Sequence, residues 1–98
     1  MFITVYSYHA RRGQEQEILS LYREWQHMLE NSSLITTDLL TNIQDPAEMM
    51  MLARFPDEEA AWAIVDSDQH RALYTRLVGM TETGPWVGYF QIQDKGRL

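Results

Sequence analysis

The sequence predicts one α+β domain with the element order β-α-β-β-α-β. Three observations lead to this prediction. The chain has 98 residues, which is about the size of a single domain. Hydrophobic residues recur with a period of about two in some segments and about 3.6 in others. Clusters of Gly, Pro, Asn and Ser separate these segments. The predicted strands are residues 2–10, 34–43, 49–55 and 86–93, and the predicted helices are residues 14–30, a short one from residue 56 and another from residue 67 or 68.

The first half of the chain supplies a strand, a helix and a second strand. Residues 2–10 (FITVYSYHA) are rich in β-branched and aromatic residues, which favour a strand. Between residues 14 and 30 apolar residues recur at steps of three and four, which is typical of a helix with one apolar face. Asn31 and two serines end this helix, and residues 34–43 (LITTDLLTNI) return to strand composition.

The second half supplies a hairpin partner, a helix in two pieces and a last strand. Residues 44–48 (QDPAE) predict a turn with Pro46 at its second position, before the strand MMMLARF. An acidic segment opens the short helix, and the stretch DSDQ breaks it and begins the next, with Ser67 or Asp68 as N-cap. Gly84 and Pro85 end that helix, and residues 94–98 are expected to fray after the last strand.

This order is the ferredoxin-like arrangement, a four-stranded antiparallel sheet with helices on one face. Such a sheet should alternate apolar and polar residues, but here most strands are apolar on both faces. The first strand places Ile3 and Val5 on one side and Phe2, Tyr6 and Tyr8 on the other. The second face would be an unusually large apolar patch on a monomer. We therefore expect a second copy of the sheet to cover it, which makes a homodimer.

Composition excludes several classes of function. The chain has no cysteine, which removes disulfides, thiolate nucleophiles and metal–thiolate sites. Its net charge of −6 argues against a nucleic-acid partner. No apolar run reaches the ~18 residues of a membrane span, so no membrane partner is expected. The N-terminal stretch lacks the basic region of a secretory signal, and we expect a cytoplasmic protein.

Several segments in a fixed order resemble a known family. They are the Arg12-Gly13 turn into an acidic helix, the LYREW run ending at Trp25, the NIQDPAEMMMLARF hairpin, and the stretch from Asp57 through DSDQHR to the closing aromatic strand. Over residues 2 to 93 the chain resembles the antibiotic biosynthesis monooxygenase family of dimeric α/β-barrel proteins. The resemblance implies that residues 1–98 form a single domain of this family with a ferredoxin-like fold, apart from the tail 94–98 expected to fray, and that the sheets pair into a dimeric barrel.

The activity that the resemblance implies is less specific, because one fold hosts many functions. Members of the family include cofactor-independent monooxygenases of quinols and polycyclic phenols, haem-degrading monooxygenases, and isomerases of small phosphorylated signals. The haem branch uses an Asn, a Trp and a His at places where this chain has Tyr6, Trp62 and Tyr74. Without the His there is no evident iron ligand, and haem degradation is disfavoured.

Cofactor-independent oxygenation needs a base, a hydrogen bond to the substrate anion and an apolar pocket. His27 is predicted to be solvated and His9 half-exposed at a strand end. His70 lies in the first turn of a helix, whose dipole favours neutral imidazole, and Tyr74 follows one turn later. His70 and Tyr74 are therefore the candidate catalytic residues. The alternative is that His70 only satisfies a backbone group or pairs with an acid.

The remaining candidate residues are aromatic or flexible apolar side chains. Tyr6, Tyr8, Met51, Trp62 and Trp86 are the predicted lining of a substrate pocket, although such residues are more often plain core or dimer interface. Trp25 is predicted to be core. We expect no metal, flavin or other cofactor, because the three histidines lie on three separate elements.

The sequence thus predicts a monooxygenase that uses dioxygen on a quinol, a polyphenol or another enolisable aromatic molecule. A non-catalytic ligand-binding dimer and an isomerase of a small metabolite are the alternatives.

Overall fold

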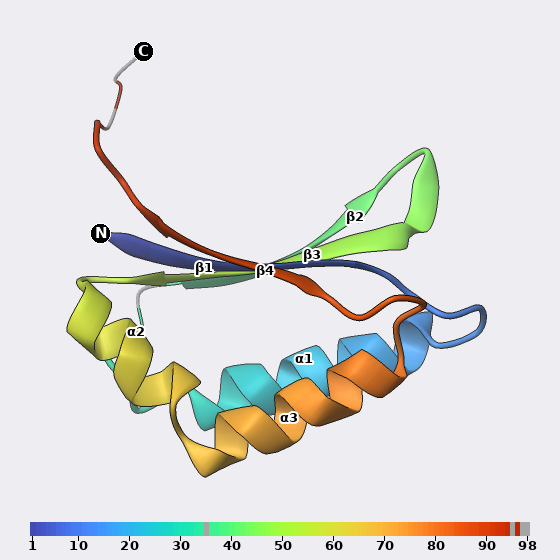
Figure 1. Cartoon of the computed structure of the whole chain (residues 1–98), viewed down its shortest axis with the longest axis horizontal. Coiled ribbons are helices and arrows are strands. Elements are labelled where there is room, and N and C mark those ends of the chain that lie inside the picture. The colour runs from blue at the N-terminus through green and yellow to red at the C-terminus, as the bar shows by residue number, and fades with distance from the viewer. Residues whose placement is uncertain (35, 95, 97–98) are drawn as a thin grey trace.

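The computed structural model describes residues 1–34, 36–94 and 96. It contains the predicted α+β arrangement, with the second helical region split in two (Figure 1). The elements are β1 (Phe2–His9), α1 (Glu15–Met28), β2 (Thr36–Asn42), β3 (Asp45–Phe55), α2 (Glu58–Val65), α3 (Asp68–Gly79) and β4 (Trp86–Gln91). Residue 35 of the predicted second strand lies outside the described residues, as do residues 95, 97 and 98 of the tail predicted to fray.

The four strands form one antiparallel sheet in the order β2-β3-β1-β4, which confirms the ferredoxin-like prediction. All three helices lie on one face of this sheet, and the other face carries no helix (Figure 1). The β2–β3 hairpin projects from the uncovered side. Among the described residues, no helix is long and apolar enough to cross a membrane.

The helix starts follow from local side-chain chemistry. Asp57 caps α2, because its carboxylate accepts a hydrogen bond from the Ala60 backbone N–H at 2.8 Å. Ser67 caps α3 and accepts from the His70 backbone N–H at 3.2 Å, so Ser67 rather than Asp68 is the N-cap. Before α1, Gly13 has a φ of 83°, a conformation that glycine adopts without strain.

The predicted turn between the second and third strands was wrong in position. β3 begins at Asp45, so Pro46 lies inside the strand and the turn consists of Ile43 and Gln44. The Asn42 side chain explains this shift, because its Oδ1 accepts from the Gln44 backbone N–H at 2.9 Å and closes the turn one step earlier. Pro46 is tolerated because β1 pairs with β3 only as far as Glu48.

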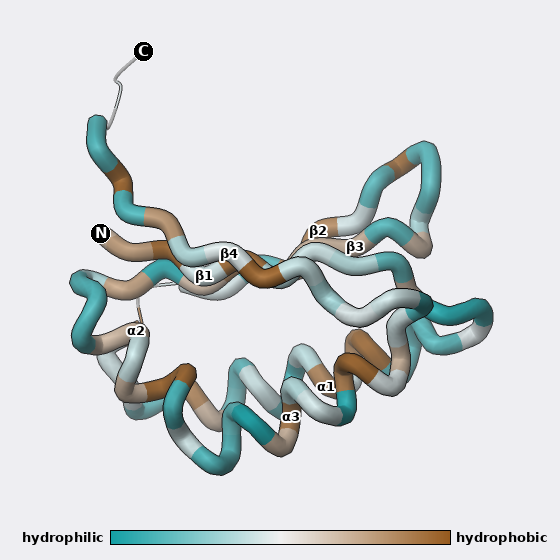
Figure 2. The backbone as a smooth tube through the Cα atoms, in the orientation of Figure 1, coloured by the Kyte–Doolittle hydropathy of each residue, from teal (hydrophilic) through white to brown (hydrophobic). Residues whose placement is uncertain are grey.

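The register of the sheet assigns each strand position to one of two faces. Tyr6 lies opposite Met51 on one side and Val87 on the other, and these three residues face the helices. The core on this face comprises Phe2, Tyr6, Tyr8, Met49, Met51, Ala53 and Phe55 from the strands, Ile18, Leu21, Trp25, Ala61 and Leu77 from the helices, and Ala10 and Leu29 directly after β1 and α1. Apolar segments run through the sheet and recur along the helices, whereas the turn between β1 and α1 is hydrophilic (Figure 2).

The opposite face, which we call the outer sheet face, is also apolar. It presents alternate residues of the same strands: Ile3, Val5, Leu40, Met50, Leu52, Trp86 and Phe90. The largest of these, Trp86 and Phe90, are 58% and 48% exposed. The prediction that both faces of the strands are apolar is therefore confirmed for the described residues.

Candidate active site

The centre of the site is Tyr6, in the middle of β1 on the helix-covered face. Central strands of an antiparallel sheet are held by ladders on both edges, and here β3 and β4 flank Tyr6. The Tyr6 side chain is 4% exposed and its ring makes an edge-to-face contact with Trp25 of α1, with ring centroids 6.1 Å apart. The strand therefore holds the Tyr6 hydroxyl at a fixed place between the sheet and the helices.

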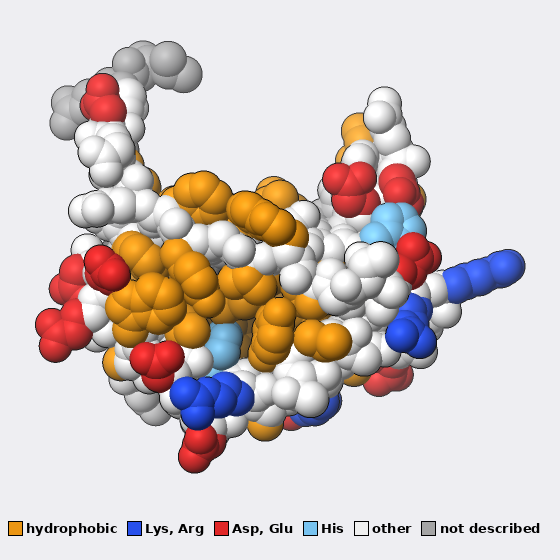
Figure 3. Space-filling view, in the orientation of Figure 1, with side chains coloured by type: hydrophobic (Ala, Val, Ile, Leu, Met, Phe, Trp, Pro, Cys, Tyr) orange, Lys and Arg blue, Asp and Glu red, His pale blue; other side chains and the backbone are white. Residues whose placement is uncertain are grey.

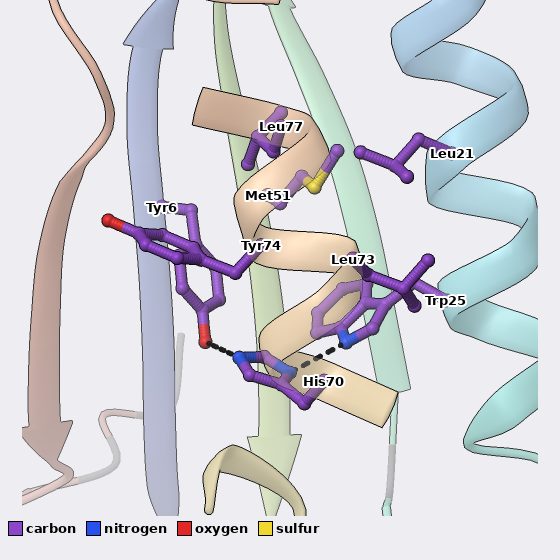
Figure 4. A pocket seen from close by; sticks show the side chains of 8 residues that line it. All are labelled: Tyr6, Leu21, Trp25, Met51, His70, Leu73, Tyr74 and Leu77. Atoms are coloured by element: carbon purple, nitrogen blue, oxygen red, sulfur yellow. Dashed lines mark hydrogen bonds between the residues drawn. The ribbon is translucent and has the colours of Figure 1, made fainter. Parts of the chain in front are cut away.

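His70 joins the sheet to both long helices. Its ring lies between Tyr6 and Trp25 and is 7% exposed (Figure 4). His70 Nε2 is 3.0 Å from the Tyr6 hydroxyl, and the Trp25 indole N–H donates to His70 Nδ1 at 3.3 Å. Because Ser67 caps the helix through the His70 backbone, the imidazole itself is left for these two partners.

These two hydrogen bonds determine the tautomer of His70. An indole N–H can only donate, so Nδ1 must be the unprotonated nitrogen of the ring. The ring proton then lies on Nε2, and Nε2–H donates to the Tyr6 oxygen. A hydrogen-bond chain thus runs from Trp25 through His70 to Tyr6, and we call it the Trp25–His70–Tyr6 chain.

Burial keeps both titratable members of this chain neutral. It lowers the pKa of His70, because a buried imidazolium loses its hydration. A second proton on Nδ1 would also oppose the Trp25 N–H. The pKa of the Tyr6 hydroxyl is raised well above its usual value, and burial is the largest cause of this rise. His70 and Tyr6 are therefore both uncharged around pH 7.

Two spaces meet at this chain. The inner cavity, between α1, α3 and the sheet, has a volume of about 20 Å³, enough for about one water molecule. The outer groove opens beside β4 and has a volume of about 410 Å³. Tyr6, His70 and Tyr74 line both spaces. The inner cavity is completed by Leu21, Trp25, Met51, Leu73 and Leu77, and the outer groove by Val65, Arg71, Thr75, Val87 and Tyr89.

The surroundings of the groove are mostly apolar. Hydrophobic side chains gather around a hollow between the sheet and the helices, with charged side chains along its lower rim (Figure 3). Among the described residues that line the outer groove, Arg71 is the only charged one. Its guanidinium lies 3.7 Å from Asp68, and its side chain is 66% exposed. The ring of Tyr89, which lines the groove, packs against Trp62 in a tilted orientation, with centroids 4.6 Å apart.

The predicted site residues separate into two groups. His70, Tyr74, Tyr6 and Met51 line one cavity, and Tyr6 rather than Tyr74 is the hydrogen-bond partner of His70. Tyr74 contributes its ring, whose centroid lies 6.1 Å from that of Tyr6. The alternative was that the His70 ring bonds a backbone group or pairs with an acid. Its hydrogen-bond partners are instead Tyr6 and Trp25.

Three predicted pocket residues lie elsewhere. Trp86 faces the outer sheet face, because it pairs with Ser7 on the odd-numbered side of β1. Tyr8 faces the helices but lines neither space, and its buried hydroxyl has no hydrogen-bond partner among the described residues. Trp62 packs on Phe2 and Tyr89 outside both spaces, and its indole N–H donates to Glu58.

Sequence reasoning missed the role of Trp25 and Tyr89. Trp25 is buried as predicted, but a position in the middle of an apolar helix stripe gave no sign that its N–H meets an imidazole. Alternation along β4 predicts that Tyr89 and Trp86 lie on opposite faces of the sheet, but it does not tell which of the two faces the helices. His9 and His27 agree with prediction: the side chains are 42% and 82% exposed and contact carboxylates.

This arrangement supports binding and polarisation more than nucleophilic attack. The site holds apolar walls, a neutral imidazole, the hydroxyl side chains of Tyr6, Tyr74, Thr75 and Tyr89, and the Arg71 guanidinium, with no carboxylate among its described lining residues. No group of three or more His, Asp or Glu side chains within the described parts of the chain is placed to hold a metal ion. A planar molecule with one ionisable oxygen suits these walls and donors.

The fold and site define a small α+β protein with a hydrogen-bonded interior site between a ferredoxin-like sheet and its helices. The sequence profile of the antibiotic biosynthesis monooxygenase family matches residues 1–76. The chain therefore belongs to the antibiotic biosynthesis monooxygenase family, as the resemblance in the sequence indicated.

Solved structures share the fold over nearly the whole chain. A mutant of SnoaB, a cofactor-independent oxygenase from Streptomyces nogalater, has a TM-score of 0.85 at 14% identity, covering 96% of this chain and 94% of that one. A conserved protein from Methanosarcina mazei has a TM-score of 0.82 at 15% identity, covering 92% and 90%. A structure described as antibiotic biosynthesis monooxygenase has a TM-score of 0.80 at 16% identity, covering 96% and 100%. No curated protein matches the chain. At these identities the similarity establishes the fold.

Proposed function

We propose that the protein is a cofactor-independent monooxygenase of a quinol, a polyphenol or another enolisable aromatic molecule. The observation that carries this proposal is the buried His70–Tyr6 hydrogen bond at the junction of an apolar cavity and an open groove. A phenol ring fits apolar walls, and its oxygen needs a hydrogen-bonding group inside them. Family membership and the SnoaB fold support the same reaction class.

The size of the outer groove agrees with a small aromatic substrate. Its volume of about 410 Å³ falls within the range of roughly 300–1,000 Å³ that small-molecule sites occupy. The inner cavity, at about 20 Å³, admits no aromatic ring. The substrate ring therefore lies in the outer groove with its oxygen toward Tyr6, and the inner cavity is left for water or dioxygen.

The reaction is a four-electron oxidation in which the substrate supplies every electron. A phenol and O₂ give a quinone and water. The phenol first loses its proton, and the ring carbon opposite the oxygen then forms a bond to O₂. Loss of the hydrogen on that carbon, with cleavage of the O–O bond, leaves a carbonyl group and releases the second oxygen as water. The site assists by stabilising the anion. A metal-free and flavin-free reaction is part of this proposal.

The proposed assembly is a homodimer through the outer sheet face. Val5, Leu52 and Phe90 belong to an apolar surface without a helix over it, and burying it against a second copy removes this area from water. We expect an interface above roughly 1,000 Å² in total. The predicted cytoplasmic location stays a prediction.

Oxygen uptake with a panel of hydroquinones and naphthols tests the proposal, on enzyme treated with a chelator. Incorporation of one atom from ¹⁸O₂ into product identifies a monooxygenase, whereas hydrogen peroxide with no label identifies a quinol oxidase. Tyr6→Phe should lose about 10²-fold or more of the rate, the order of an oxyanion donor. Tyr8→Phe is the matched control, one pleat along the same face. Ligand binding without oxygen uptake would support a binding protein instead.

A further inference from the structure

The hydroxyl hydrogen of Tyr6 has no acceptor among the described residues. The Tyr6 oxygen receives a hydrogen bond from His70 Nε2–H at 3.0 Å, and no other hydrogen bond to it is present in the described part of the chain. Thr4 lies on the same face of β1 and is 1% exposed. Its side chain lowers the pKa of Tyr6, as a nearby hydrogen-bond donor does, although its Oγ1 has no partner at hydrogen-bond distance among the described residues. The buried Tyr8 hydroxyl on this face also has no partner among the described residues, but of these three hydroxyl side chains only Tyr6 lines the inner cavity and the outer groove. Buried donors are rarely left unused without a reason.

The direction of the Trp25–His70–Tyr6 chain explains where that hydrogen points. Trp25 donates to Nδ1 and Nε2–H donates to Tyr6, so both imidazole nitrogens are occupied. Each donor polarises the next, which makes the Tyr6 O–H a stronger donor than an isolated phenol. Tyr6 lines both the inner cavity and the outer groove, so its hydrogen is available to a molecule bound there.

We propose that Tyr6 is the catalytic hydrogen-bond donor of this site, that Trp25 and His70 are its positioning residues, and that the site takes its phenol or enol as the oxygen anion. This inference rests on the proposed function and names the ionic form of its substrate. It also replaces the prediction that His70 is the proton acceptor. An imidazole with Trp25 N–H on one nitrogen and its own proton on the other has no free lone pair for the substrate.

Water, rather than His70, accepts the proton of the substrate. The phenol O–H bond breaks, the electron pair stays on the substrate oxygen, and the proton passes to water in the outer groove. The remaining anion accepts the Tyr6 O–H hydrogen bond. Arg71, on the same groove, adds a positive charge, and none of its described lining residues carries a negative one. Both features favour the anion over the neutral phenol.

Nuclear magnetic resonance tests the tautomer directly. In ¹⁵N-labelled protein at pH 7, His70 should show its proton on Nε2 and a bare Nδ1, with the signals assigned by their loss in His70→Gln. Trp25→Phe removes the hydrogen bond to Nδ1, and both neutral tautomers of His70 should then be populated. A wild-type ring with its proton on Nδ1 would overturn the inference, since Tyr6 would then give its hydrogen to His70.

Anaerobic binding of 4-nitrophenol tests the ligand form. The phenolate and the phenol have different absorption spectra, so the affinity for each is measured by titration on either side of the pKa of the probe. We expect the phenolate to bind at least about tenfold more tightly, the scale of one hydrogen bond to a charged group. Tyr6→Phe should abolish this preference and Trp25→Phe should reduce it severalfold. Tyr8→Phe should retain it.

A wild-type protein that prefers neutral 4-nitrophenol, or a Tyr6→Phe variant that keeps the preference for phenolate, would refute the inference. Neither measurement uses oxygen. Absence of oxygen uptake in a protein that still selects phenolate would therefore end the oxygenase proposal and leave the anion site. Oxygen uptake by a protein that does not prefer phenolate would end the anion-site inference and leave the oxygenase proposal.

Discussion

Replacing His70 by Leu should destabilise the protein strongly. The leucine fills most of the space but offers no hydrogen bond to the Trp25 N–H or the Tyr6 hydroxyl, which are in side chains 5% and 4% exposed. A buried polar group left without a partner costs about 1–3 kcal/mol. Tyr6 borders the outer groove and can reach water there, so its cost falls at the lower end. The expected loss is about 2–4 kcal/mol of unfolding free energy.

This loss corresponds to a fall in Tm of about 8–32 °C, since 1 kcal/mol shifts a domain of this size by about 4–8 °C. Thermal and urea unfolding at pH 7 and a fixed protein concentration measure it, because a dimer makes Tm depend on concentration. His70→Gln is the matched variant: its amide keeps one acceptor and one donor, and it should lose about 1 kcal/mol. A His70→Leu protein as stable as the wild type would refute the hydrogen-bond chain.

Further predictions concern pH, assembly and one glycine. Burial lowers the pKa of His70, so unfolding free energy should fall as pH drops below about 6.5, where the unfolded chain binds that proton first. The hydrogen bond to Asp45 raises the pKa of His9, whose contribution is complete below about 6.5 and is lost as pH rises through the folded value. In urea unfolding across pH, His70→Gln should flatten the acidic side and His9→Gln the alkaline side; unchanged curves would contradict these assignments. Leu52→Asp should yield monomers or unfolded chains in sedimentation, and a wild-type monomer at micromolar concentration would contradict the dimer. Gly88→Ala should weaken the dimer, because its Cβ would lie 2.5 Å from the Trp86 ring and must displace it; an unchanged dissociation constant would count against the outer sheet face.

The fold could be predicted because its signals are local. Period-two strands, one clear amphipathic helix and side-chain caps such as Ser67 each act within a few residues. The hairpin was misplaced by the same reasoning, since Pro46 suggested a turn that the Asn42 side chain forms instead. Both residues favour turns, and only the pairing of β3 with β2, in which Asn42 lies opposite Asp45, decides which one is used.

The site could be predicted only in part, because its contacts are between distant elements. Spacing along α3 correctly placed His70 and Tyr74 on the same side of the helix. It said nothing of Trp25 and Tyr6, which are 45 and 64 residues away and meet the ring only through tertiary packing. For Trp86, the sequence paired it correctly with Phe90 but did not say which parity of β4 faces the helices; the register with β1 does.

The alternation of side chains along β1 explains why both faces of the sheet are apolar. Even-numbered residues such as Tyr6 build the site with α1 and α3, while odd-numbered residues such as Val5 build the outer sheet face. One strand therefore serves ligand binding on one side and, in the proposed dimer, assembly on the other. Trp25, His70 and Tyr6 all come from one chain, so the hydrogen-bond chain needs no partner residue. In the proposed dimer the second copy would cover the other face of the strand that holds Tyr6, while β3 and β4 keep that strand in the interior of the sheet.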